Sequence, residues 1–391
     1  MAAALALRKR GHSVTILERE PELGGVPRHC AHSPFGMLEF GRVLFGPAYA
    51  RRLATEAQAA GVSTLLRHSV TALNAGGRLD LTTPDGVRHL SARRVLLATG
   101  ARETPRSARL ISGDRPIGVI TTGTLQHMVN LEGLRPMRRA LVVGTELVSF
   151  SALLTCRSAG ITPVAMVDES PRLVARSVFA AYPRLTGIPL HLGVKIVDIR
   201  GAHRVEAVTL QRADGTQFEV ACDGVILTGR FTAEASLALA SHLEVDPGSG
   251  GPVVDQYARC SDPSYFAAGN MLHPVETGGW CFREGRRIGH LIADDLAGRL
   301  PGSEGAITLK PGANLRYVLP QRIAFGGPKG FGDIQIRVAR PVSSGLVMEC
   351  AAKALWSRKG AALPERRILA PLAALADAKA GSTIVVRARE G

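Results

Sequence analysis

The first 25 residues constrain the fold of this chain more than any other stretch. Residues 2–10 are good helix formers, and Gly11 ends the predicted helix. A short β-branched and apolar strand is predicted at 14–17, closed by Glu18, and Gly24-Gly25 follows after a polar turn. This order is typical of the second half of a βαβ dinucleotide-binding unit, in which an acidic residue at the strand end accepts hydrogen bonds from a ribose.

The first half of such a unit is missing from the printed sequence. A hydrophobic strand and a Gly-x-Gly-x-x-Gly turn would lie immediately before Met1, and that strand would be central in its sheet and buried on both faces. We therefore hypothesise a truncated N-terminus, caused by a start codon assigned too far downstream. Sequencing the N-terminus of the native protein tests this hypothesis, and native material that begins at Met1 contradicts it.

A second βαβ pattern begins near residue 138 and is complete. A buried strand is predicted at 140–143, a helix runs from the following turn through Ala159, and the next strand spans 163–167. Asp168 closes that strand, as Glu18 closes the first. The chain therefore carries two units of the dinucleotide-binding type, one after the other.

The turn of the second unit departs from the Gly-x-Gly-x-x-Gly pattern. Gly144 occupies the first glycine position, but Glu146 and Ser149 occupy the other two. Because the second glycine lets the backbone approach a pyrophosphate, a carboxylate there adds bulk and negative charge, and repels phosphate unless it is protonated or paired. Asp168 lies 24 positions after Gly144, near the spacing of a ribose-binding acid. On balance the altered turn disfavours NAD(P) binding at this second site.

Two further turns place small residues at strand ends. Residues 96–105 read LLATGARETP, and residues 265–270 read YFAAGN. Small residues at such positions let the backbone approach a ligand closely. A helix follows at about 278–296. The remaining predicted elements are a helix at 47–60, strands at 63–73, 190–199, 205–212, 217–221 and 224–228, a hairpin at 79–90, and period-two runs at 334–339, 346–351, 368–372 and 383–388.

Charge and composition exclude several classes of protein. The net charge is +15, yet no basic run with interleaved aromatic residues appears, so we expect no nucleic-acid partner. The longest apolar stretch, 140–155, is too short to span a membrane and contains Gly144 and Glu146. The six cysteines form no C-x-x-C pair, which favours a reducing, cytoplasmic location and no metal site.

Taken in this order, these motifs resemble the two-dinucleotide-binding flavoproteins of the pyridine nucleotide-disulfide oxidoreductase family. The resemblance covers about residues 1–300. It implies an α/β fold with two Rossmann-like domains, one nested in the other, plus a small C-terminal β domain. The implied domains are an FAD-binding domain at 1–130 and 246–300, an NAD(P)-binding-like domain at 138–245, and a β-rich domain at 305–391.

The resemblance also implies roles for single residues around FAD. Glu18 would hold the adenosine ribose, Val70 would contact adenine through its backbone, and Gly269 and Asn270 would reach the ribityl chain and the pyrophosphate. Asn270 stands where the family usually has Asp, but an amide still bonds a ribityl hydroxyl. The other implied cofactor-binding residues are Gly24, Gly25, Ala98, Thr99, Gly100, Thr277, Gly278, Gly279 and Trp280.

The helix that begins near Thr277 would point its positive end at the flavin pyrimidine and stabilise negative charge on reduced flavin. Trp280 and Cys281 either line the isoalloxazine or are buried in helix packing. His29, His32 and His273 are candidates for proton transfer, although ordinary loop hydrogen bonding is the favoured interpretation.

One departure from the family narrows the function. Disulfide reductases of this fold carry two cysteines just after the Gly-Gly, whereas this loop reads GGVPRHCAH and holds only Cys30. A redox-active disulfide is therefore not expected, and Cys30 is interpreted as structural. The GG-x-PR-x-C, G-T-E-x-V-S-F-S and A-A-G-N motifs resemble the larger subunit of multi-component dehydrogenases such as opine oxidase, dye-linked proline dehydrogenase and hydrogen cyanide synthase.

That resemblance implies an FAD-dependent oxidoreductase that is the electron-transferring subunit of an amine or amino-acid dehydrogenase. Its partner would be a second flavoprotein subunit that oxidises the small-molecule substrate. Two alternatives are a self-sufficient NAD(P)H-dependent flavin reductase and a non-catalytic assembly protein. The sequence names no catalytic residue, and the β-rich tail is interpreted as a docking or dimerisation module.

Overall fold

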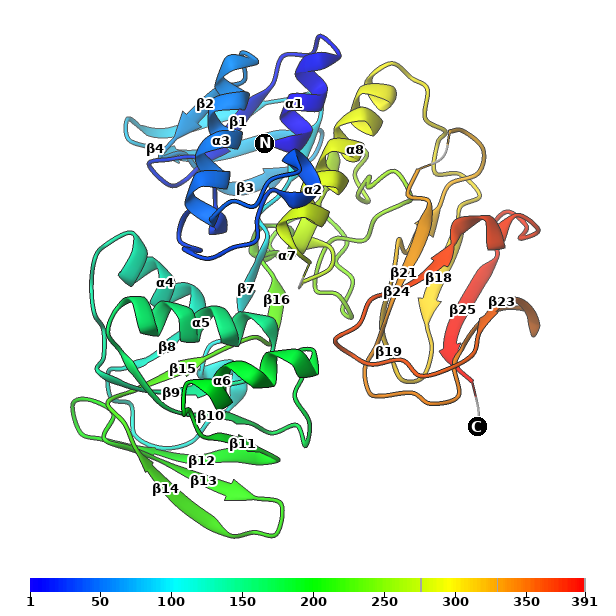
Figure 1. Ribbon diagram of the computed structural model, residues 1–391. Helices are drawn as coiled ribbons and strands as arrows, with labels where there is room; N and C mark the ends of the chain where they lie inside the picture. Colours follow the sequence, from blue (N-terminus) through cyan, green and yellow to red (C-terminus); the bar gives the residue numbers. More distant parts are fainter. Residues whose placement is uncertain (275, 329, 390–391) are drawn as a thin grey trace. The chain divides into compact units, whose positions relative to one another are not determined.

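The computed structural model describes residues 1–274, 276–328 and 330–389 (Figure 1). The chain divides into two compact units. The first comprises residues 1–23, 53–101 and 233–391, and the second comprises 24–52 and 102–232. Because most of the second unit is inserted within the first, the nested arrangement expected from the sequence is confirmed. The predicted domain boundaries stay predictions.

The first unit begins with a helix that packs on a later one through small residues. Helix α1 (Ala2–Lys9) lies beside α8 (Gly278–Leu296) in Figure 1. A Cβ atom at Gly289 would lie only 2.6 Å from the carbonyl oxygen of Ala3, so the two backbones meet where α8 has no side chain. The sequence of good helix formers followed by Gly11 therefore places α1 as predicted.

The strands of the first unit's nucleotide-binding region form short sheets. β1 (Thr15–Glu18) pairs in parallel with β2 (Ser63–Leu66), and β6 (Val95–Leu97) pairs in parallel with β17 (Tyr265–Ala267). The other elements here are a three-stranded antiparallel sheet of β3 (Ser69–Asn74), β4 (Arg78–Thr83) and β5 (Gly86–Ser91), helix α3 (Gly46–Ala59), which starts in the second unit, and α7 (Ser236–Leu239).

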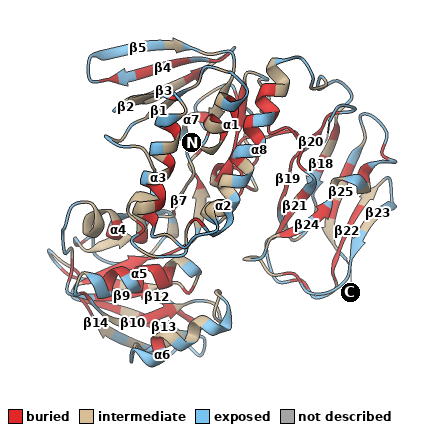
Figure 2. Cartoon of the chain, turned by 45° about the horizontal axis from the view of Figure 1, so that its top comes forward, coloured by how far each residue is buried: buried red, intermediate tan, exposed pale blue. Residues whose placement is uncertain are grey.

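The C-terminal part of the first unit is a sandwich of two sheets around one core. The five-stranded sheet has the order β20-β18-β25-β22-β23, and the three-stranded sheet has the order β19-β21-β24. Buried residues of both sheets belong to one hydrophobic cluster (Figure 2). The strands are β18 (Ile307–Pro311), β19 (Leu315–Leu319), β20 (Arg322–Ile323), β21 (Asp333–Val338), β22 (Leu346–Cys350), β23 (Lys353–Arg358), β24 (Ile368–Pro371) and β25 (Thr383–Ala388).

The second unit contains a five-stranded parallel sheet in the order β11-β10-β9-β15-β8. Its central strands, β9 (Arg139–Val143) and β15 (Gly224–Leu227), are almost entirely buried, as the uninterrupted apolar runs predict. Helix α5 (Leu147–Ser158) connects β9 to β10 (Thr162–Asp168), which completes the predicted βαβ unit.

The other elements of the second unit surround this sheet. They are β8 (Val119–Thr121), β11 (Leu190–Leu192), an antiparallel sheet of β12 (Val194–Arg200), β13 (Ala207–Arg212) and β14 (Gln217–Ala221), and helices α2 (Met37–Phe40), α4 (Thr122–Asn130) and α6 (Ala181–Leu185). Strands β7 (Ala101–Glu103) and β16 (Phe231–Ala233), which pair with each other, carry the chain from one unit to the other.

Three local predictions are wrong. The strand expected at 63–73 is interrupted because Arg67 adopts a left-handed conformation with φ of 57°. The strand expected at 190–199 is interrupted at Gly193, with φ of 67°. The β domain is not wholly antiparallel, since β18 and β25 pair in parallel. Among the described residues, no helix is long and apolar enough to cross a membrane.

Candidate functional site

Strand ends of the first unit gather the predicted cofactor-binding turns at one edge of a sheet. The parallel register of β6 and β17 sets Leu97 opposite Ala267, and the Ala268 N–H donates to the Leu97 carbonyl oxygen at 3.0 Å. The Ala98-Thr99-Gly100 turn and the Gly269-Asn270 turn therefore leave the sheet together. This is the edge, at the carboxyl ends of parallel strands, where open α/β sheets bind ligands.

Both turns contain a glycine that the backbone requires. Gly100 has φ of 80° and Gly269 has φ of 73°, in the left-handed region that disfavours a side chain. A Cβ at Gly100 would meet no atom within 4 Å, and one at Gly269 would meet only the Cys281 side chain, at 3.6 Å. The Thr99 hydroxyl donates to the Glu234 carbonyl oxygen at 2.6 Å, which fixes the first turn. Space beside both glycines is thus open.

The other predicted residues of this unit lie on separate strands. Glu18 ends β1, and one of its carboxylate oxygens accepts the N–H of Glu20 at 3.0 Å. Val70 lies in β3 opposite Leu81. Gly24 and Gly25 belong to the other unit and have φ of 133° and 59°.

Asn270 holds the loop that leads into α8. Its side-chain oxygen accepts the Glu276 N–H at 2.7 Å, and its amide nitrogen donates to the Glu276 carbonyl oxygen at 3.2 Å. This clamp uses one donor and one acceptor position of the amide, which leaves further capacity for the implied bond to a ribityl hydroxyl.

The N-terminus of α8 is a set of backbone donors without a side-chain cap. Thr277 is the N-cap residue, but its hydroxyl makes no capping hydrogen bond. The first N–H groups of a helix have no partner within the helix, and here they belong to Gly278, Gly279 and Trp280. The positive end of a 19-residue helix therefore suits an electron-rich or anionic group.

A buried carboxylate–imidazole pair stands behind these turns. His273 Nε2 lies 2.7 Å from Glu284 Oε1, and the other oxygen of Glu284 accepts the Gly269 N–H at 2.6 Å. Burial alone lowers the pKa of His273, but the Glu284 carboxylate more than offsets it and raises that pKa above its usual value. His273 Nδ1 is buried with no hydrogen-bond partner among the described residues, and such atoms normally have a partner.

Two arginines of the C-terminal sandwich reach the same loop. Arg367 Nη1 lies 3.0 Å from Glu276 Oε2, and Arg337 Nη2 lies 3.6 Å from Glu276 Oε1. The guanidinium carbon of Arg367 also lies 3.6 Å from the ring centroid of Trp280. Burial raises the pKa of Glu276 even though these cations oppose the shift. Trp280, which is 39% exposed, is therefore not buried in helix packing but lies against Arg367.

In the second unit, Glu146 fills the turn that a nucleotide pyrophosphate would need. Its carboxylate lies so close to Gly229 that a Cβ there would overlap it. The Ser149 hydroxyl donates to Glu146 Oε2 at 3.4 Å, and Thr228 Oγ1 lies 2.6 Å from Ser149 Oγ. Burial raises the pKa of Glu146. Gly144 has φ of 122°, and a Cβ there would overlap Thr228 Oγ1.

Glu103 and Arg109, which the sequence did not single out, complete this cluster. Glu103 accepts the N–H groups of Gly123 and Gly229 at 2.8 and 3.1 Å. Arg109 donates to the carbonyl oxygens of Thr228 and Gly229, both at 2.9 Å. Burial raises the pKa of Glu103.

Asp168, at the end of β10, already has partners within the second unit. Its carboxylate accepts from Thr145 Oγ1 at 2.5 Å and from the Ser170 N–H at 2.8 Å. These bonds hold the acid at the strand end, which is the position predicted for a ribose-binding residue.

Cys30 is a buried single thiol in the second unit. Its Sγ donates to Gln126 Oε1 at 3.5 Å, and burial raises its pKa to about 12. All six cysteines are free. A thiol held protonated in this way is a poor nucleophile.

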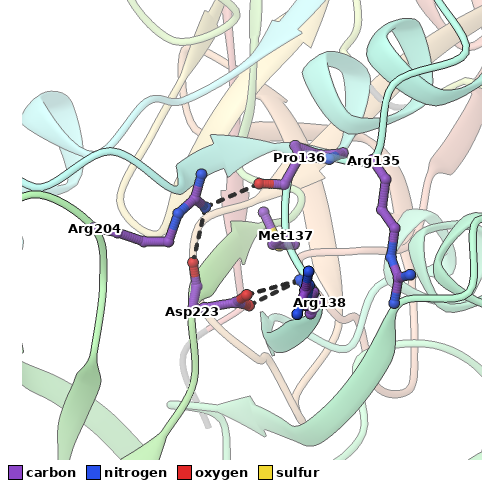
Figure 3. A pocket seen from close by; sticks show the side chains of 6 residues that line it. All are labelled: Arg135, Pro136, Met137, Arg138, Arg204 and Asp223. Atoms are coloured by element: carbon purple, nitrogen blue, oxygen red, sulfur yellow. Dashed lines mark hydrogen bonds between the residues drawn. The ribbon is translucent and has the colours of Figure 1, made fainter.

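A pocket of about 310 Å³ lies elsewhere in the second unit (Figure 3). Arg204 donates to the carbonyl oxygens of Pro136 and Asp223, and the Asp223 carboxylate accepts the Arg138 N–H at 2.9 and 3.0 Å. Since β9 and β15 begin beside these residues, the pocket lies at the edge of the sheet opposite Gly144.

Comparison with known proteins decides the family. The model described as pyridine nucleotide-disulphide oxidoreductase matches residues 1–288. The chain belongs to this family. Members are oxidoreductases that generally bind FAD and NAD(P), so the family expected from the sequence is confirmed.

The curated relatives are distant, and this chain spans only about half of their length. An opine oxidase subunit of Agrobacterium tumefaciens (strain Ach5) is 24% identical over 302 residues, covering 69% of this chain and 58% of that protein. The equally named opine oxidase subunit of Rhizobium meliloti (strain 1021) is 26% identical over 174 residues, covering 44% and 37%. A probable ferredoxin reductase of Castellaniella defragrans is 27% identical over 186 residues, covering 45% and 43%.

Solved structures share the fold. Thioredoxin reductase of T. acidophilum has a TM-score of 0.62 at 18% identity, covering 76% of this chain and 94% of that one. L-proline dehydrogenase from P. horikoshii has a TM-score of 0.53 at 19% identity, covering 76% and 53%. These likenesses confirm the predicted α/β fold class.

Proposed function

We propose that this chain is the FAD-containing, electron-transferring subunit of a multi-component amine or amino-acid dehydrogenase. Its partner is a second flavoprotein subunit that oxidises a small-molecule amine or amino acid. Similarity to two proteins named as opine oxidase subunits supports this assignment.

The position of Glu146 is the observation that carries the proposal. NADH or NADPH needs its pyrophosphate against the turn at Gly144, and the Glu146 carboxylate covers Gly229 there. Cys30, buried with a raised pKa, offers no redox pair either. If neither nicotinamide nor a disulfide exchanges electrons with this chain, a partner must do so.

The residues of the first unit suit FAD. Bound FAD supplies hydride and electron transfer. Glu18 accepts from a ribose, the open turns at Gly100 and Gly269 admit the phosphate-bearing chain, and the uncapped N-terminus of α8 donates to the electron-rich ring.

The test is anaerobic reduction of the native complex, purified through a tag on this chain. We expect flavin absorption bands that bleach on addition of L-proline, an opine or a simple amine, and that stay unchanged with NADH or NADPH. This chain purified alone should keep its flavin and lose substrate oxidation. Bleaching by NADH alone, at a rate that supports turnover, contradicts the proposal, and absence of flavin from the native complex contradicts it as well.

A second candidate is an NAD(P)H-dependent flavin reductase. Asp168, at the end of β10, and similarity to a probable ferredoxin reductase favour it. The NADH arm of the same experiment separates the two. A native complex that lacks flavin would instead favour a non-catalytic assembly protein.

A further inference from the structure

The C-terminal sandwich contributes buried charge to the loop before α8. Glu276 is 7% exposed at its side chain, and its two cationic partners, Arg337 and Arg367, are 7% and 18% exposed. Arg337 comes from β21, and Arg367 immediately precedes β24. Neither the β-rich tail nor Glu276 carries a motif, so no sequence pattern signals this cluster.

The charges of the cluster do not cancel. Arg337 and Arg367 face the single carboxylate of Glu276, which leaves one positive charge in excess. His273 and Glu284 also lie near Glu276, and as a protonated imidazole and a carboxylate they offset each other. The cluster adjoins the N-terminus of α8, so the excess charge has the same sign as the helix dipole there.

Some donors around this positive field have no partner among the described residues. His273 Nδ1 is buried and unpaired there, and the α8 N-terminus lacks a side-chain cap. Buried donors of this kind are normally satisfied, so the site is built to face an electron-rich group. On the proposed function, that group is the flavin.

We propose that Arg337 and Arg367 of the C-terminal sandwich set the electrostatic environment of the flavin by offsetting Glu276. This inference rests on the proposed function. Without the arginines, the Glu276 carboxylate would oppose the positive end of α8 and disfavour negative charge on reduced flavin. The arginines act through Glu276 and are positioning residues, so the sandwich is part of the redox site rather than a docking module alone.

The same contacts fix geometry. Asn270 clamps the Glu276 backbone and adjoins Gly269, while Arg367 covers Trp280 in the first turn of α8. A change at Arg367 therefore reaches both the turn and the helix. Charge and geometry make different predictions, because only charge predicts effects of opposite sign.

The experiment measures the flavin midpoint potential of the native complex in single variants. Arg367→Gln should shift the reduced-to-oxidised ratio about tenfold toward oxidised flavin, a fall of about 30 mV for a two-electron couple. Glu276→Gln should shift it in the opposite direction. Arg367→Lys, which keeps the charge, should stay near wild type.

Two variants guard against misfolding and nonspecific effects. The double variant Arg367→Gln/Glu276→Gln keeps the excess of one positive charge and leaves no carboxylate unpaired, so its potential should return toward wild type. Arg387→Gln is the matched control, because Arg387 pairs with Glu349 within the five-stranded sheet at 3.0 and 3.1 Å. It should leave the potential unchanged.

The outcomes separate the two proposals. Flavin present in wild type with equal potentials in Arg367→Gln and Glu276→Gln, or with shifts of the same sign, overturns the electrostatic inference alone. Absence of flavin from the wild-type complex overturns the proposed function and this inference with it.

Discussion

The turn at Gly269 in the first unit and the turn at Gly144 in the second are built on similar plans and differ in what surrounds them. Both follow a buried parallel strand and precede a helix. A Cβ at Gly269 would meet only the Cys281 side chain, at 3.6 Å, whereas Gly144 is enclosed by Thr228 and Glu146. One side chain at the crossing of strand and helix is therefore enough to fill a dinucleotide turn while the fold is retained.

The largest expected effect is on stability at the filled turn. Gly144→Ala forces a side chain into a left-handed conformation and against Thr228 Oγ1. Conformational strain of about 1–2 kcal/mol and overpacking of about 1–3 kcal/mol should together lower the free energy of unfolding. Urea denaturation measures this, with Gly215→Ala, also at positive φ but with no neighbour within 4 Å, as the control. Equal losses in both variants would show that the turn is not filled.

The second effect concerns pH. Because burial raises the pKa of Glu146, the folded protein binds this proton more tightly than the unfolded chain does, and stability falls as pH rises from about 4.5 through the raised value. Glu146→Gln should therefore stabilise the protein above that range, by about 1–3 kcal/mol as for an uncompensated buried polar group, and give no gain below about pH 4. Denaturation curves at acidic and at mildly alkaline pH measure the difference. A gain that is independent of pH contradicts the assignment.

A smaller effect is expected at the open turn. Gly269→Ala has room for its methyl group, so the loss of stability should be limited to conformational strain of about 1–2 kcal/mol. If the flavin's phosphate-bearing chain lies against Gly269, FAD affinity should fall about tenfold, which corresponds to about 1.4 kcal/mol. Fluorescence titration of the apoprotein with FAD measures it. Unchanged affinity would remove Gly269 from the proposed site.

The smallest effect is on thiol chemistry. Cys30, Cys156 and Cys281 are held protonated, with pKa values raised to about 12 by burial, so they should react slowly with a disulfide reagent at mildly alkaline pH. Cys30→Ser should leave flavin reduction unchanged, because the thiol lies outside the electron path. Rapid labelling of Cys30, followed by mass spectrometry of its peptide, would contradict this prediction.

Local periodicity predicted most of the fold. The α8 helix was expected at 278–296 and spans Gly278–Leu296. Buried parallel strands such as β9 and β15 follow from uninterrupted apolar runs. Breaks at Arg67 and Gly193 were missed, because a single left-handed residue interrupts a strand without altering its apolar pattern.

The sites were predictable only where one turn contains the chemistry. Glu146 stands out in a glycine pattern, but its contact with Gly229 joins residues far apart in sequence, and pairing with Ser149 and Thr228 needs the folded sheet. The Glu276 cluster joins three separate segments of the chain. No periodicity marks a buried ion pair of this kind, because each partner alone looks like a surface charge.

The close approach of α1 and α8 at Gly289 has a mechanical consequence. With the carbonyl oxygen of Ala3 only 2.6 Å from where a Cβ would lie, neither helix can slide along the other without a clash between backbone and side chain. The two helices therefore move as one rigid lever, with the Trp280 turn at one end. Any force that a partner applies to α1 would be transmitted along the 19 residues of α8 to that turn.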